Sequence, residues 1–160
     1  MIDSITRATE LVTCGNHSNT IDPLAARRLL LTLNAVAGLE SDGGSTTAWS
    51  TSAPMRRTAG YLVAVGEPAT RLVTTTDSDE LFFHVFEFVN RWYEYGSTQY
   101  LGLWADATGA TWIDACEYHS NMHAARAAAD RAEQLAYWDI TNGVERLASL
   151  GEYSIGLGML

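Results

Sequence analysis

Pairs of strand-like segments alternate with single helix-like segments from residue 61 to the end of the chain. Short runs rich in β-branched and aromatic residues predict strands, and apolar residues spaced three and four apart predict helices. We therefore expect an α+β fold in which antiparallel hairpins form one sheet and the helices cover one of its faces. The expected order is ββαββαββ, with strands at 61–66, 70–76, 100–106 and 111–119, helices at 77–95 and about 122–134, and a last hairpin around Asn142-Gly143.

Two dipeptides mark the turns of the first and last expected hairpins. Glu67-Pro68 separates the strands at 61–66 and 70–76, so these two strands should pair with each other. Asn142-Gly143 is the strongest two-residue hairpin signal in the chain, because both positions of such a turn take positive φ.

The segment 77–95, DSDELFFHVFEFVNRWYEY, is the best-defined helix. Asp77 is a favourable N-cap, Glu80 completes a capping-box pattern three residues later, and Gly96 would end the helix. Most other positions are aromatic or branched and should face the core. The polar positions follow spacings of four, three, four and three and should form one stripe: Glu80, His84, Glu87, Arg91 and Glu94.

An amino-terminal helical segment is expected over residues 1–39. Its clearest part is 22–37, where Asp22 is a good N-cap, Pro23 suits the first helical position and Gly38 would end the helix.

Residues 40–59 are rich in Ser, Thr and Gly and have no periodicity, which predicts a flexible loop. Residues 60–160 would then form the α+β core. At 160 residues the chain is long enough to bury a core and should be a single domain, 1–160.

The net charge of −9 is concentrated in the later part of the chain. Residues 1–60 hold five Arg and five acidic residues, whereas residues 61–160 hold five Arg and fourteen acidic residues. A negative field of this kind repels nucleic acid and favours partners with a basic surface, including proteins that themselves bind nucleic acid. The simpler interpretation is that the charge provides solubility alone.

The acidic stripe of the helix at 77–95 is the candidate partner-binding site. Its carboxylates would imitate the phosphates of a nucleic acid, and Asp106, Asp114 and Glu117 would extend it if the sheet edge lies nearby. A solvated helix face is the alternative. The predicted contact residues are Asp77, Asp79, Glu80, Glu87 and Glu94.

The motif Cys-x-x-His-Ser-Asn occurs twice, beginning at Cys14 and at Cys116. Thiolates and imidazoles are the usual zinc ligands, so Cys14, His17, Cys116 and His119 together predict a Cys2His2 site. An internal duplication is a second interpretation. A third is that Ser-Asn simply caps the following helix in both places.

An enzymatic alternative uses a histidine with a neighbouring acid. His84 lies within helical contact distance of Glu80 and Glu87, and His119 offers a second histidine. The chain contains no P-loop, no G-x-S-x-G and no H-E-x-x-H motif, so no catalytic residue is assigned. A pocket that holds both the histidine and the acid would favour this alternative.

Residues 101–147 carry a recurrent pattern: LGLWADATGATWIDACEYH, a helix with AARAAADRAEQLA, then YWDITNGVE. This pattern resembles small uncharacterised proteins of actinobacterial phages and mobile elements. The resemblance covers under a third of the chain, includes no catalytic residue, and does not extend to the Cys-His cluster. The lysine-free composition suits the same source. The resemblance implies a mobile-element origin and a ββαββ arrangement.

These features together predict an acidic, non-enzymatic protein that inhibits a host nucleic-acid-directed defence complex, of the anti-CRISPR or antirestriction type. The partner would be a host protein with a basic nucleic-acid-binding surface, with no direct contact to nucleic acid or membrane. The alternatives are a zinc-stabilised structural domain and a small enzyme. With no leader-like or membrane-spanning run and two cysteines, we expect a cytoplasmic protein without a cofactor unless zinc binds. A homodimer is left open.

Overall fold

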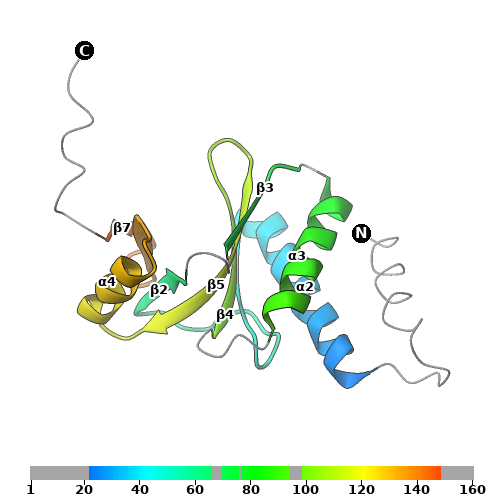
Figure 1. Ribbon diagram of the computed structural model, residues 1–160, viewed down its shortest axis with the longest axis horizontal. Helices are drawn as coiled ribbons and strands as arrows, with labels where there is room; N and C mark the ends of the chain where they lie inside the picture. The colour runs from blue at the N-terminus through cyan, green and yellow to red at the C-terminus, as the bar shows by residue number, and fades with distance from the viewer. Residues whose placement is uncertain (1–21, 66–69, 76, 94–98, 149–160) are drawn as a thin grey trace, which may run out of the picture.

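The computed structural model describes residues 22–65, 70–75, 77–93 and 99–148 (Figure 1). The strands pair antiparallel throughout and belong to one seven-stranded sheet, so the predicted α+β class with an antiparallel sheet is confirmed. None of the helices within these ranges combines the length and apolar character that a membrane span requires. The elements are α2 (Pro23–Asp42), β1 (Gly44–Ala48), β2 (Tyr61–Ala64), β3 (Thr70–Val73), α3 (Ser78–Trp92), β4 (Tyr100–Ala105), β5 (Thr111–His119), α4 (Met122–Arg131), β6 (Ala136–Asp139) and β7 (Val144–Leu147).

Strand β5 is the centre of the sheet. The strand order is β1-β4-β5-β2-β6-β7, and β3 pairs with β5 outside this path. β4 and β5 form the long hairpin in the middle of Figure 1, with Tyr100 opposite Cys116 and Ala105 opposite Thr111. Its nine residues give β5 enough length to pair with β4 on one side and with two short strands on the other.

The predicted hairpin between 61–66 and 70–76 is wrong. β2 pairs with the end of β5, Tyr61 opposite His119, and β3 pairs with its beginning, Val73 opposite Thr111. The two strands therefore lie end to end along the same edge of β5 and run in the same direction. Pairing of both strands with β5 replaces their pairing with each other. Glu67 and Pro68 lie outside the described residues.

The last hairpin forms where predicted, but its turn is not the predicted two-residue type. Asp139 lies opposite Val144, which leaves four residues in the connection. Gly143 has a φ of 63°, whereas Asn142 is not among the described residues with positive φ. Asn142 instead donates its backbone N–H and its side-chain amide to the Asp139 carboxylate, at 3.1 and 2.8 Å. These bonds lower the pKa of Asp139.

Helix α2 begins as predicted and ends five residues later than predicted. The Asp22 side chain accepts the N–H of Leu24 at 3.1 Å. The helix continues through Gly38 to Asp42, and Gly43, at a φ of 74°, donates its N–H to the Leu39 carbonyl. Gly38 does not end the helix, because its role is to let β1 approach. A Cβ at Gly38 would lie 2.7 Å from Ser45 Cβ.

The prediction of a loop over 40–59 is wrong for its first part. Residues 40–42 complete α2, and Gly44–Ala48 form β1, which pairs with β4 from Gly44 opposite Trp104 to Ala48 opposite Tyr100. The Ser and Thr residues that suggested a loop are tolerated here because β1 lies at the edge of the sheet. Residues 49–60 form no helix or strand.

The helices pack against the sheet in two clusters within the described residues. Side chains alternate between the two faces along β4 and β5, and on one face α2 and α3 pack on Leu101, Leu103, Ile113 and Ala115. Further along, α4 packs its buried alanines on Val63 of β2. The sheet twists between these two clusters, so the helices lie at separate places in Figure 1.

The opposite face of the sheet is partly covered by residues 49–60. Leu62 and Cys116 are buried there beside Tyr100. Arg57 fixes the covering segment: its guanidinium carbon lies 3.8 Å from the centre of the Tyr118 ring, and its Nε donates to the Tyr100 hydroxyl at 2.9 Å.

Candidate binding site between strand β3 and helix α3

Helix α3 begins at the predicted N-cap. The Asp77 carboxylate accepts the backbone N–H groups of Asp79 and Glu80, both at 2.9 Å. One face of the helix is buried in the core through Leu81, Phe82, Val85, Phe86, Phe88 and Val89. The predicted polar stripe is therefore the solvent-facing side, and its first half borders β3.

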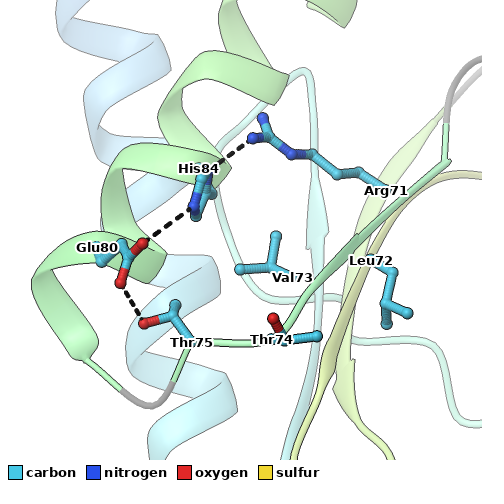
Figure 2. A pocket seen from close by; sticks show the side chains of 7 residues that line it. All are labelled: Arg71, Leu72, Val73, Thr74, Thr75, Glu80 and His84. Carbon is cyan, nitrogen blue, oxygen red and sulfur yellow. Dashed lines mark hydrogen bonds and ion pairs between the residues drawn. The ribbon is translucent and has the colours of Figure 1, made fainter.

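A groove of about 450 Å³ lies between β3 and the first half of α3 (Figure 2). One wall is the consecutive run 71–75, and the other is formed by Glu80 and His84. A second hollow of about 340 Å³ adjoins it on the exposed side of α3. It is lined by Asp79, Glu80, Phe83, His84 and Glu87. Glu80 and His84 belong to both hollows, so they form the shared ridge of one acidic surface.

A chain of polar contacts fixes the side chains of this ridge, as the dashed lines in Figure 2 show. Arg71 places Nη2 2.6 Å from His84 Nδ1 and Nη1 3.2 Å from Glu87 Oε2. His84 Nε2 lies 3.7 Å from Glu80 Oε1. The Thr75 hydroxyl donates to Glu80 Oε2 at 2.5 Å. The network therefore connects β3 to two turns of α3.

The contact with Arg71 determines the tautomer of His84. A guanidinium only donates hydrogen bonds, so His84 Nδ1 must accept, and the proton of the neutral ring lies on Nε2, on the side of Glu80. The histidine and the acid of the enzymatic alternative do share a groove. However, the lone pair that a general base would use is occupied by Arg71, so the arrangement orients side chains and offers no free base.

Negative charge predominates around the groove. Glu80 and Glu87 line these hollows, where the Arg71 guanidinium contacts His84 and Glu87. Asp77 and Asp79 stand at the start of the same helix. Of the other predicted contact residues, Glu94 lies outside the described residues.

The three sheet acids that were expected to extend the acidic surface if the sheet edge lay nearby either have local partners or are buried. Asp106 lies in the β4–β5 turn, where its carboxylate accepts the Thr108 hydroxyl at 2.5 Å and backbone N–H groups. These hydrogen bonds, first the one from the Thr108 side chain, lower the pKa of Asp106. Glu117 lies on the helix face of β5, 3.4 Å from His119 Nε2. Asp114 is buried.

Asp114 is the titratable residue that sequence reasoning misplaced. Only 2% of its surface is exposed, and within the described part of the chain no hydrogen bond reaches its carboxylate. Burial raises its pKa to about 7. Asp114 lies opposite Gly102 of β4, and its side chain is on the face of the sheet away from the helices. The available signal was a single acid within the apolar strand TWIDACE.

The described half of the predicted zinc site does not converge. Cys116 is fully buried beside Tyr100 and Leu62, whereas His119, three residues along the same strand, pairs with Tyr61 on the other face. Side chains three apart in a strand point to opposite faces, so these two cannot share one ion as they stand. Across the described ranges, no three His, Cys, Asp or Glu residues are grouped to hold a metal. Cys14 and His17 lie outside the described residues.

The Ser-Asn part of the second motif serves as a helix cap. The Asn121 side chain accepts the Ala124 N–H at 2.9 Å at the start of α4. The capping interpretation is therefore confirmed for this copy of the motif, while residues 18 and 19 of the first copy lie outside the described residues.

Comparisons with protein-family models, with curated proteins and with solved structures found no match to this chain. The site is therefore interpreted from its own geometry and charge.

Proposed function

We propose that this chain is an acidic, non-enzymatic binding protein, and that its site is the acidic groove. We define the acidic groove as the hollow between β3 and α3 together with the rim carboxylates Asp79, Glu80 and Glu87. The carrying observation is that these carboxylates gather around a hollow whose guanidinium, Arg71, is already engaged by His84 and Glu87. This role needs no cofactor.

The chemistry of the acidic groove supports a basic protein as the partner. Lys or Arg side chains entering the hollow would meet Glu80 and Glu87 together, and a bond between a cation and a carboxylate is among the strong hydrogen bonds. A nucleic acid would be repelled by the same field. A merely solvated helix face needs no hollow beside it, so the groove favours a binding role.

The sharper form of this proposal names the partner class. A host complex directed at nucleic acid has a basic surface that holds phosphates, and a rigid row of carboxylates can occupy such a surface. We propose inhibition of such a defence complex, in the cytoplasm, by occlusion of that surface. The acidic groove supports this form, and an origin in a phage or mobile element is part of the same proposal.

Capture from the natural host tests the proposal. The full chain is immobilised as wild type, as the groove variant Asp79→Asn/Glu80→Gln/Glu87→Gln, and as a charge-matched control, Asp130→Asn/Glu133→Gln/Glu145→Gln, whose exposed acids lie on or beside α4 and β7.

The expected result is that wild type and control retain the same basic, nucleic-acid-binding protein, and that the groove variant retains at least tenfold less of it. Binding should weaken as salt is added, because it depends on charges at the surface. The proposal would be contradicted if the groove variant retained as much of the partner as the wild type does. It would also be contradicted if nucleic acid bound directly to the immobilised chain in the absence of a partner protein.

A further inference from the structure

Strand β3 uses only one of its edges within the described sheet. β2 pairs with β5 on one side and with β6 on the other, Leu62 lying opposite Trp138. β3 continues the line of β2 along β5, but the position that corresponds to β6 is not filled by any described strand. This free edge borders the acidic groove, because residues 71–75 form the groove's wall.

The backbone direction at the free edge follows from the pairing on β5. Backbone groups of an antiparallel strand alternate between its two neighbours. The Ala115 carbonyl accepts from Val65 N–H at 2.9 Å, so the odd-numbered residues of β5 face the side of β2 and β3. Arg71 and Val73, which lie opposite Ile113 and Thr111, therefore bond to β5.

Leu72 accordingly directs its backbone N–H and C=O away from β5, toward the free edge. Its side chain lies on the face away from the helices and is 46% exposed, an unusual exposure for a leucine within a sheet. The side chains of Arg71 and Val73 point to the other face, toward α3, as Figure 2 shows. Among the described residues, the edge thus has backbone groups that no strand pairs with, an apolar side chain on one face and the acidic groove on the other.

We propose that the free edge of β3 binds an extended segment of the protein partner by strand addition, and that this segment alternates basic and apolar side chains. Strand addition between an edge strand and a flanking helix is a common way to hold a peptide. Side chains of an added strand alternate between the two faces, so every second one would reach Glu80 and Glu87, and the others would lie beside Leu72. This inference rests on the proposed function, because it takes the basic partner from it.

A synthetic octapeptide of alternating arginine and valine, blocked at both ends, is the probe. Its affinity for the full chain is measured by calorimetry with wild type, Leu72→Pro and Leu72→Ala. Proline removes the outward N–H of Leu72 without removing a bond to β5, which is where an edge strand tolerates proline. Alanine keeps that N–H and removes only the apolar side chain. We expect at least a tenfold loss of affinity for Leu72→Pro and less than a threefold loss for Leu72→Ala.

A modified peptide tests the same point on the wild-type chain, in case Leu72→Pro does not fold by circular dichroism. Methylation of alternate backbone nitrogens removes donors and keeps the charge and side chains. Methylation of the alternate nitrogens whose N–H groups face β3 should weaken binding at least tenfold. Methylation of the other set, whose N–H groups face away from β3, should not weaken binding. Equal binding of both peptides, or no binding of the parent peptide, overturns strand addition.

Two further outcomes separate this inference from the proposed function. If Glu80→Gln/Glu87→Gln weakens the peptide while Leu72→Pro and methylation do not, the charge-based site stands and strand addition is wrong. If Leu72→Pro weakens the peptide but the groove variant captures the host partner normally, strand addition stands and the proposed function fails. Sedimentation of the chain without peptide tests whether a second copy of the chain occupies the free edge of β3. If the wild type is a dimer and Leu72→Pro is a monomer, the second copy is the occupant and the inference is overturned.

Discussion

Arg71 of β3 and His84 of α3 are joined by a contact of 2.6 Å between guanidinium Nη2 and imidazole Nδ1, which connects the sheet to the helix. The same guanidinium reaches Glu87 at 3.2 Å. A residue of the sheet therefore holds a histidine and a carboxylate of α3 in fixed positions. The acidic groove keeps its shape through this contact.

The first prediction concerns the tautomer of His84. In the wild-type chain, the neutral imidazole of His84 should carry its proton on Nε2, because Arg71 donates to Nδ1. In Arg71→Ala this donor is lost, and the neutral ring should become a mixture of both tautomers. Long-range proton–nitrogen correlation spectra of the imidazole distinguish the two forms.

His123 provides the control for this measurement, because it is exposed on α4 and far along the chain from Arg71. Its spectrum should be the same in the wild type and in Arg71→Ala. A wild-type His84 already divided between both tautomers would contradict the proposed contact.

The second prediction concerns the pH dependence of stability through Asp114. Burial raises the pKa of this carboxyl from 3.8 to about 7 in the folded chain, so folding takes up a proton between these values. The free energy of unfolding should therefore fall as pH rises from 4 to 7, and the loss should be complete above pH 7. Asp114→Asn, which is neutral throughout, should equal the wild type near pH 3.5 and be more stable at pH 8 by on the order of 4 kcal/mol.

Urea unfolding at several pH values measures this effect. Asp106→Asn is the control of opposite sign, because hydrogen bonds in the turn lower the pKa of Asp106. That carboxylate stabilises the fold above its unfolded pKa, and the stabilisation disappears as pH falls through the folded pKa. If Asp114→Asn is less stable than the wild type at pH 8, the carboxyl has a partner that the described structure lacks.

Local signals in the sequence predicted the helix starts well. Asp22, Asp77 and Asn121 each accept a backbone N–H at the first turn of a helix, and each was identifiable because capping depends only on the next three residues. The acidic side of α3 was predictable for the same reason, since helical spacing fixes which side chains share a face.

Long-range pairing explains most of the errors. β2 and β3 pair with β5 and not with each other, and no feature of residues 61–76 indicates that a strand forty residues later is long enough for both. The free edge of β3 follows from the same pairing, so the strand side of the acidic groove was not predictable. Arg71 was also missed as a site residue, because its partners lie on α3.

The third prediction separates the two candidate caps of α4. Asn121→Ala removes the oxygen that accepts the Ala124 N–H, and should lower the free energy of unfolding by about 1 kcal/mol. Ser120→Ala is the matched control, because Ser120 precedes the cap and is exposed. Denaturant unfolding of both variants measures the difference. An equal loss in both would mean that the two residues cap the helix jointly.

The fourth prediction tests the close approach of α2 and β1 at Gly38. Helix propensity alone predicts that Gly38→Ala stabilises an interior helical position by up to about 1 kcal/mol. The close contact with Ser45 predicts instead that Gly38→Ala lowers the free energy of unfolding. The added Cβ would lie 2.7 Å from Ser45 Cβ, and forcing an extra methyl into a packed site costs about 1–3 kcal/mol. Denaturant unfolding of the variant decides between these two expectations.

A double-mutant cycle with Ser45→Gly assigns the cost to this contact. Ser45→Gly alone should destabilise the fold, because it removes the hydroxyl that donates to the Ala35 carbonyl at 2.7 Å. In that background the Cβ of Ser45 is absent, so Gly38→Ala should lose its penalty and approach the value set by helix propensity. Additive effects of the two substitutions would show that the helix and the strand do not meet at this point.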